Sequence, residues 1–192
     1  MQSNFLKLLS SEDIAMVPII KTVFYNFVLL SSLTQQEQDL LQQAAQVRNN
    51  AQAPYSEFYV GVAVCDQYGV VHAGCNVERC SYSQTTHAEQ NAIDGMIAMN
   101  GASKITCVAL VAAPKDVKVT FKEKKHARAP ESLDMVPLPC GHCLQCIWEN
   151  CLNDESVKVL SYVGDGIVLV TTIGDLFPAR FGPTQLGINY EL

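Results

Sequence analysis

Two short runs of polar residues, far apart in the sequence, constrain this chain more than any other feature. They are THAEQ at residues 86–90 and PCGHC at residues 139–143. His87, Cys140 and Cys143 offer nitrogen and sulfur donors that suit Zn²⁺, and three protein ligands leave one tetrahedral position open for a water molecule. A fold that uses these donors together must therefore bring the two runs to one place.

Glu89 has two alternative uses. It lies two residues after His87, near enough to exchange protons with a water in the open position without being a ligand itself. Thr86 and Glu89 also have the Thr-x-x-Glu spacing of a capping box, in which the glutamate only completes the start of a helix. The order His-x-Glu and then Pro-Cys-x-x-Cys is the known signature of zinc-dependent deaminases, so the match favours a catalytic Glu89.

Each run is expected to open a helix. The unpaired N–H groups at a helix N-terminus carry partial positive charge, which lowers the pKa of a nearby thiol. We therefore expect Cys140 and Cys143 to bind the metal as thiolates beside a neutral His87. Cys146 leaves an alternative open, because a fourth protein ligand would close the site and make the zinc structural. It could instead be a small buried side chain one helical turn after Cys143.

Composition limits the class of protein and of substrate. The 192 residues are most simply one globular domain, with 48% hydrophobic and 17% charged residues. A net charge of −6 argues against broad binding to nucleic acid or to an anionic membrane. A small neutral substrate fits this charge better.

The eight cysteines are expected to be reduced thiols in a cytoplasmic protein. The apolar run over residues 14–30 is interrupted by Pro18, Lys21 and Asn26, and it is short for a bilayer span. We therefore expect neither an export signal nor a membrane segment.

The first part of the chain is expected to form a helical N-terminal extension over residues 1–50, followed by a catalytic domain over residues 51–192. Residues 1–33 are predicted as one or two helices, whose apolar face packs on the core, on a second subunit or on a membrane surface. That face comprises Val17, Ile20, Phe24, Phe27 and Val28. Thr34 and Glu37 have capping-box spacing and open a second helix that reaches about residue 47.

The rest of the chain alternates strands and helices. Residues 114–137 interrupt this alternation as a polar insertion that contains six of the thirteen Lys and Arg residues. We expect the insertion to be a solvated loop, and the alternatives are a substrate lid or an RNA contact. Two strand–helix–strand passages imply crossover helices on a mixed sheet. The expected strands are residues 58–65, 70–75, 105–112, 157–163 and 167–172, and the expected helices residues 86–99 and 140–150.

Four motifs in order extend the match beyond the metal donors. They are PYSEFYVG at residues 54–61, GCNVE at 74–78, QTTHAEQ at 84–90 and FPARFGP at 177–183. With them the chain resembles the cytidine deaminases from about residue 50 onward, and most of all the catalytic half of the large dimeric bacterial type. The resemblance implies an α/β fold, a three-layer α/β/α sandwich around a five-stranded mixed sheet.

The resemblance also implies an activity and its residues. The activity is hydrolytic deamination of cytidine and 2′-deoxycytidine in pyrimidine salvage, with one Zn²⁺ per subunit. The substrates are free pyrimidine nucleoside and water, and no nucleic acid is expected as a partner. By the same likeness, Asn76 and Glu78 bind the ribose hydroxyl, Phe58 stacks near the base and Ala88 helps to recognise the pyrimidine edge. Phe181 reaches the site of a neighbouring subunit in a homo-oligomer, a dimer or a tetramer.

Several of these residues, and the function itself, have alternative interpretations. Phe58 and Phe181 could be core residues, and Asn76 a turn residue. Leu144 stands where the family often has arginine, and the insertion at 114–137 is longer than the family's usual link. The rival functions are deamination of adenosine, of cytosine in RNA or of a nucleoside antibiotic, and a non-catalytic zinc module.

Overall fold

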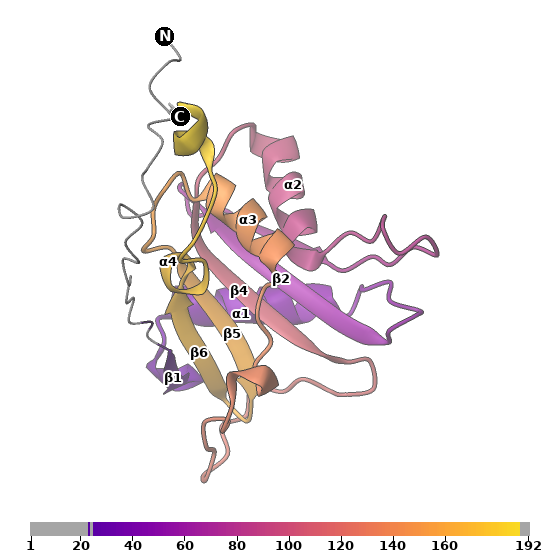
Figure 1. Cartoon of the computed structure of the whole chain (residues 1–192). Helices are drawn as coiled ribbons and strands as arrows, with labels where there is room; N and C mark the ends of the chain where they lie inside the picture. The colour runs from indigo at the N-terminus through magenta and orange to yellow at the C-terminus, as the bar shows by residue number, and fades with distance from the viewer. Residues whose placement is uncertain (1–22, 24, 189–192) are drawn as a thin grey trace, which may run out of the picture.

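A mixed sheet of six strands carries the helices in the computed structural model, which describes residue 23 and residues 25–188 (Figure 1). The strand order is β1-β6-β5-β4-β2-β3. Its strands are β1 (Asn26–Leu29), β2 (Phe58–Asp66), β3 (Val71–Cys75), β4 (Ile105–Pro114), β5 (Lys158–Gly164) and β6 (Ile167–Thr172). The helices are α1 (Gln35–Arg48), α2 (Ala88–Asn100), α3 (Gly141–Asn150) and the short α4 (Ile173–Leu176), with 3-10 turns at Leu30–Ser32, Leu133–Met135 and Pro183–Leu186.

Both expected crossovers are observed. β4 and β5 pair in parallel and are joined through α3, while β3 and β4 each pair antiparallel with β2 and are joined through α2. β3 and β4 therefore run in the same direction, so their carboxyl ends lie at the same edge of the sheet. The helix that follows each strand begins near that edge, which brings the N-termini of α2 and α3 together.

The sheet has six strands where five were expected, because the N-terminal segment adds one. The prediction of helix for residues 1–33 is wrong over Asn26–Leu29, which pair antiparallel with β6. The Leu30 N–H donates to the carbonyl of Gly166 at 2.8 Å and continues the contact. Pairing with an otherwise open sheet edge satisfies backbone groups that helical periodicity does not take into account. Val17, Ile20 and Phe24 lie outside the described residues.

Helix α1 begins as its capping box predicts. The Thr34 side chain accepts the Glu37 backbone N–H at 3.3 Å, and the Glu37 carboxylate accepts the Thr34 N–H at 2.9 Å. Three buried residues, Leu40, Leu41 and Ala44, then pack on β2 and β4. The boundary at residue 50 between an extension and a catalytic domain stays a prediction.

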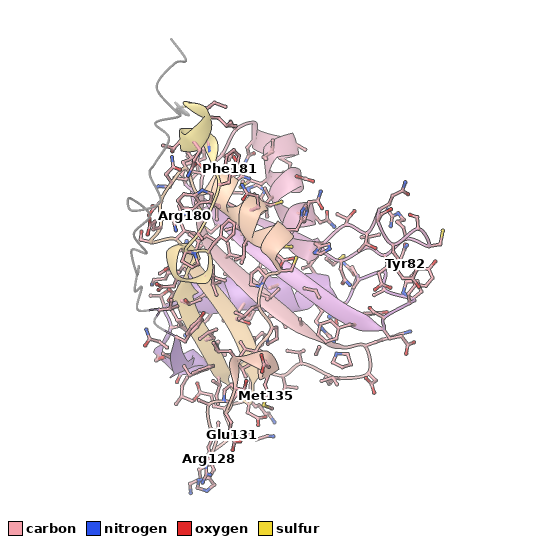
Figure 2. All side chains as sticks on the ribbon, viewed as in Figure 1. Tyr82, Arg128, Glu131, Met135, Arg180 and Phe181 are labelled. Carbon is pink, nitrogen blue, oxygen red and sulfur yellow. The ribbon has the colours of Figure 1, made fainter. Side chains whose placement is uncertain are left out.

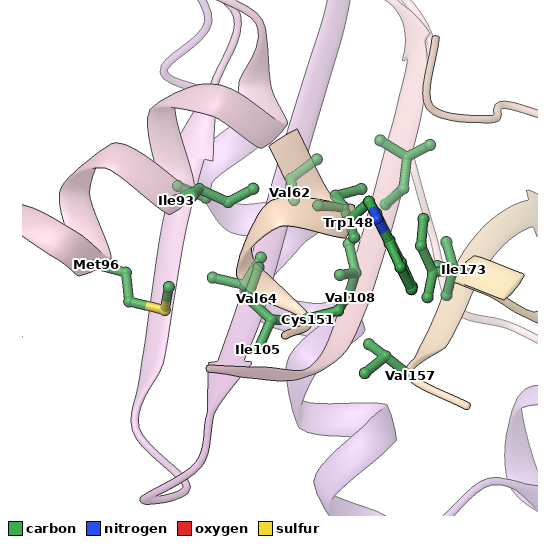
Figure 3. Packing of buried hydrophobic residues seen from close by; sticks show 14 of the residues in the cluster. Val62, Val64, Ile93, Met96, Ile105, Val108, Trp148, Cys151, Val157 and Ile173 are labelled. Atoms are coloured by element: carbon green, nitrogen blue, oxygen red, sulfur yellow. The ribbon is translucent and has the colours of Figure 1, made fainter. Parts of the chain in front are cut away.

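Two apolar layers hold the sheet between its helices. Alternate residues of β2 face opposite ways, as strand geometry requires: Ala63 packs toward α1, and Val62 and Val64 pack toward α2 and α3. Figure 3 shows the apolar layer between the sheet and helices α2 and α3, where Ile93 and Met96 of α2 and Trp148 of α3 pack against the strands. The metal-donor residues stand on helices fixed by this layer.

A glycine lets α2 approach the sheet closely. A Cβ on Gly74 in β3 would lie 2.7 Å from the carbonyl oxygen of Ala88, closer than real Cβ contacts. The absence of a side chain at this position therefore sets the depth at which the first turn of α2 lies. That turn carries Glu89.

The polar insertion is only partly a solvated loop. Its first residues pack on the α1 side of the sheet, where Val119 and Phe121 join the apolar layer and the Phe121 ring lies 4.7 Å from that of Tyr162. Its later residues project from the body of the molecule, as Arg128 and Glu131 show in Figure 2. Within the described residues, no helix combines the length and the apolar character that crossing a bilayer would need.

Candidate active site

The structure brings the two conspicuous sequence runs together at the starts of two helices. His87 is the N-cap residue of α2, Cys140 is the N-cap residue of α3, and Cys143 lies in the first turn of α3. The His87 Nδ1 atom is 3.3 Å from Cys143 Sγ and 3.5 Å from Cys140 Sγ, and the two sulfurs are 3.6 Å apart. These three donor atoms form a group that could hold a metal ion.

The spacing of the donors fits zinc. Tetrahedral bonds of about 2.3 Å to sulfur and about 2.05 Å to nitrogen place two sulfurs about 3.8 Å apart and a nitrogen about 3.6 Å from a sulfur. The observed separations are close to these values. Cys146 is outside the group, and its sulfur lies 3.8 Å from the Nε2 atom of His142. Among the described residues, three protein donors rather than four surround the position.

Burial affects the protonation of Cys143. It raises the pKa of the Cys143 thiol, and the charge of the nearby Glu89 carboxylate acts in the same direction. The expectation of a thiolate concerns the metal-bound site and stays a prediction. A bound divalent cation reverses this effect, since a coordinating thiol loses its proton.

Glu89 is not part of a capping box. The cap of α2 is His87, so Glu89 is the second residue of the helix, and the alternative that pairs it with Thr86 as cap is wrong. Thr86 instead exchanges backbone hydrogen bonds with Val77 at 2.9 and 3.0 Å. The Glu89 residue is 5% exposed and its carboxylate is close enough to Cys143 to influence the thiol. A carboxylate is thus buried beside the donor group without a capping role.

A cavity of about 290 Å³ opens beside these residues. Five segments contribute to its wall: the start of β2, the loop after β3, the start of α2, strand β4 and the residues before α3. Polar and metal-donor side chains share the wall with a larger apolar part. It is lined by Phe58, Val60, Asn76, Thr85, His87, Ala88, Glu89, Leu110, Ala112, Pro137, Leu138 and Cys140.

Two features of the sequence could have identified part of the apolar wall. Pro137 and Leu138 directly precede the PCGHC run, so a site at Cys140 implies that they lie near it. Leu110 and Ala112 have the same parity in β4 and thus face the same side of the sheet. The register of β4 beside β2 depends on tertiary pairing, which local pattern does not specify.

Asn76 lines the cavity and is fixed by the backbone of β2. Its Oδ1 accepts the Val60 N–H at 2.9 Å, and its Nδ2 donates to the Phe58 carbonyl, also at 2.9 Å. The amide retains one acceptor lone pair and one N–H for another partner. The side chain is therefore held in a single orientation at the wall.

Glu78 lies outside the cavity lining and binds the segment before β2. Its Oε2 accepts the backbone N–H groups of Tyr55 at 2.8 Å and Ser56 at 3.2 Å. The hydrogen bond with the Ser56 side chain, helped by these backbone donors, lowers the pKa of the Glu78 carboxyl. The structure thus brings Asn76, but not Glu78, into the wall of this chain's cavity.

The two aromatic residues of the predicted site are both exposed. Phe58 lines the cavity at 41% exposure, while Phe181 is 55% exposed and lies outside the cavity lining. The alternative that they are core residues is therefore wrong. Gln145 donates to the Phe181 carbonyl at 2.9 Å and anchors that segment to α3. Leu144, the other departure from the family pattern, packs against the apolar layer of α2 and α3.

Comparison with known proteins agrees with this arrangement. The family model described as the cytidine and deoxycytidylate deaminase zinc-binding region matches residues 34–158. A cytidine deaminase of Sporosarcina psychrophila is 30% identical over 152 residues, which cover 79% of this chain and 96% of that protein. A cytidine deaminase of Vibrio parahaemolyticus is 32% identical over 142 residues, which cover 73% of this chain but 38% of that longer protein.

Solved structures show the same likeness. The crystal structure of a cytidine deaminase from Burkholderia pseudomallei superposes with a TM-score of 0.60 at 30% identity, covering 78% of this chain and all (100%) of that one. The cytidine deaminase of Mycobacterium tuberculosis gives a TM-score of 0.55 at 28% identity, covering 75% of this chain and 95% of that one.

Proposed function

Since the chain belongs to the cytidine and deoxycytidylate deaminase family, we propose that it hydrolyses free cytidine and 2′-deoxycytidine to the uridine forms and ammonia. The observation that supports this most directly is the group of His87, Cys140 and Cys143 donors beside the buried Glu89, at the wall of a cavity. The cavity volume of about 290 Å³ is close to the lower end of small-molecule sites. A role in pyrimidine salvage follows from a free nucleoside substrate.

One Zn²⁺ per subunit is the proposed cofactor. When bound, it supplies the Lewis acidity that makes a water molecule nucleophilic near neutral pH. His87, Cys140 and Cys143 are the proposed ligands, because their nitrogen and sulfur atoms have the separations that tetrahedral zinc requires. A non-catalytic site with four protein ligands is not supported, since Cys146 lies outside the group.

Glu89 is the proposed proton carrier. It accepts a proton from the attacking water as the water oxygen bonds to C4 of the pyrimidine, and it delivers that proton to N3. It then takes the remaining proton from the hydroxyl group now on C4 and passes it to the exocyclic amine. The C4–N bond breaks, the C4 oxygen becomes the carbonyl of uridine, and one cytidine and one water have given one uridine and one ammonia. The burial of Glu89 favours this role, because general acid–base catalysis needs a carboxyl held within reach and shielded from bulk water.

The remaining site residues are proposed to bind and orient the nucleoside. Asn76 offers its free lone pair and N–H to a ribose hydroxyl, with Glu78 beside it in sequence, and Phe58 stacks near the base. Backbone groups at Ala88, the first residue of α2, are placed to recognise the pyrimidine edge. Phe181 is proposed to complete the site of a second copy, because it is exposed and lies away from its own chain's cavity.

An activity screen tests the proposal. Zinc-loaded protein is given cytidine, deoxycytidine, adenosine and cytosine, and ammonia and the deaminated base are measured. We expect turnover of the first two, and a Glu89→Gln variant that keeps its zinc but loses about 10²–10⁴-fold in kcat. The exposed Asp94→Asn on the same helix is the control and should retain activity. No turnover of cytidine by zinc-loaded protein, or full activity of Glu89→Gln, would overturn the proposal.

A further inference from the structure

A second hollow lies on the other helical face of the sheet, between α1 and the start of the insertion. Its volume is about 560 Å³, larger than that of the candidate active site, and the two share no lining residue. Cationic side chains from both segments line it: Arg48 from α1, and Lys115 and Lys118 from the insertion. Asp116 is the acidic residue of its wall. We call this hollow the α1 groove.

Arg48 is a buried cation with an incomplete set of partners. The residue is 3% exposed; its Nε donates to the Tyr59 carbonyl at 3.1 Å, and its Nη2 donates to the carbonyls of Ala113 and Pro114 at 2.8 and 2.6 Å. Among the described residues no carboxylate forms an ion pair with it, and its Nη1 has no hydrogen-bond partner.

Arg48 lines the groove and, within the described part of the chain, keeps one unpaired nitrogen, Nη1. No described side-chain nitrogen or oxygen is both fully buried and unpaired, so the unpaired Nη1 must reach solvent, and Arg48 lines the groove. Arginine keeps its charge even when buried, and this charge has no counter-ion in the described structure. An anion in the groove would supply that counter-ion.

The surrounding side chains are also available. Lys115 and Lys118 form no ion pair among the described residues. The side-chain amides of Gln42, Gln46 and Asn49 form no hydrogen bond among these residues either. Three cations and three amides thus line one groove of a chain whose net charge is −6. A local excess of positive charge on an acidic protein attracts anions to that place.

We propose that the α1 groove binds a phosphorylated nucleotide. The guanidinium and ammonium groups match phosphate, which has several acceptor oxygens and more than one negative charge. The groove is large enough for more than a lone phosphate, and Val119 and Phe121 add an apolar part to its wall against which a base can lie. The inference does not depend on the activity proposed above, since no catalytic residue takes part.

Calorimetric titration of the zinc-loaded protein with adenosine triphosphate tests the proposal, with inorganic tripolyphosphate and adenosine as separate probes. We expect saturable one-to-one binding of the triphosphate, weaker binding of tripolyphosphate and none of adenosine. The double variant Lys115→Gln, Lys118→Gln should weaken triphosphate binding by at least about tenfold, because charge-assisted hydrogen bonds to phosphate are lost.

A matched control separates the groove from general charge. The double variant Lys122→Gln, Lys125→Gln removes the same charge from the same segment but outside the groove lining, and should bind the triphosphate as the parent does. Equal weakening in the two variants, absence of saturable binding, or tripolyphosphate binding as tight as the nucleotide would overturn the proposal. Glu89→Gln should bind the triphosphate unchanged, so failure of the deaminase proposal would not affect this result.

Discussion

Cys143 Sγ lies 3.3 Å from His87 Nδ1, although 56 residues separate the two in sequence. The contact exists because each residue stands at the start of a crossover helix, and both helices follow strands whose carboxyl ends share one edge of the sheet. The donor group is therefore a consequence of the topology, and its spacing depends on how α2 and α3 pack.

Removal of a single donor should abolish metal binding. We expect Cys143→Ala to reduce bound zinc from about one ion per chain to a small fraction of that, because two remaining protein donors hold zinc weakly. Cys146→Ala, one helical turn further on, should keep a full complement, since Cys146 lies outside the donor group. Plasma mass spectrometry of the purified variants measures this, and loss of zinc from Cys146→Ala would contradict the assignment.

Asn76 should contribute to stability as well as to substrate binding. Asn76→Ala removes the partners of the Val60 N–H and the Phe58 carbonyl, so we expect it to lower the free energy of unfolding by about 1–3 kcal/mol. It should also raise KM for cytidine. Asn50→Ala, at an exposed position, should change stability by less than about 0.5 kcal/mol. Equal urea midpoints for the two variants would show that the Asn76 bonds do not stabilise β2.

The segment that carries Phe181 should be sensitive to one methyl group. A Cβ on Gly182 would lie 2.6 Å from Nε1 of Trp148, so Gly182→Ala must displace the ring or the segment, at a cost of about 1–3 kcal/mol. Trp148 is the single tryptophan of the chain, so its fluorescence reports the displacement. Gly95→Ala, in open space within α2, should instead stabilise the protein by about 0.5–1 kcal/mol. An unchanged emission spectrum in Gly182→Ala would contradict this packing.

Local patterns in the sequence predicted the elements whose signals lie within a few residues. Thr34 and Glu37 form the capping box that their spacing predicts. Asp165 and Gly166 lie between the strands expected at residues 157–163 and 167–172, and both have the positive φ angles of a tight hairpin turn. The donors His87, Cys140 and Cys143 came together as predicted, because their residue types and order are specific to one kind of site.

Features that depend on distant partners were missed. The strand at Asn26–Leu29 forms because β6 offers an open edge, and Val119 and Phe121 are held by contacts with a surface built from other segments. Burial, which the sequence alone does not show, raises the pKa of the Cys143 thiol. Helical periodicity and charge counts contain none of this information.

Acid should remove a contribution to stability that comes from Asp66. Burial alone would raise the pKa of this carboxyl, but hydrogen bonds with His72 and with the backbone N–H groups of Val70 and Tyr68 bring it below the ordinary 3.8. Because the pKa of this carboxyl is lower in the folded than in the unfolded protein, its ionised form stabilises the fold fully at pH values above the ordinary pKa. This stabilisation is then lost as pH falls through the folded-state pKa.

The urea midpoint as a function of pH tests this. We expect the parent to exceed Asp66→Asn in stability near neutral pH, and the difference to shrink as pH falls below about 4. Asp94→Asn, at an exposed position of α2, should follow the parent throughout. A difference between the parent and Asp66→Asn that does not change with pH would show that the ionised carboxylate is not what stabilises the fold.

X-ray absorption at the zinc edge of the zinc-loaded protein measures the coordination of the bound metal. We expect two sulfur neighbours at about 2.3 Å and one imidazole nitrogen at about 2.0–2.1 Å, with a light oxygen or nitrogen atom in the fourth position. Three or more sulfur neighbours, or no imidazole, would contradict a site built from His87, Cys140 and Cys143 with a position open to water.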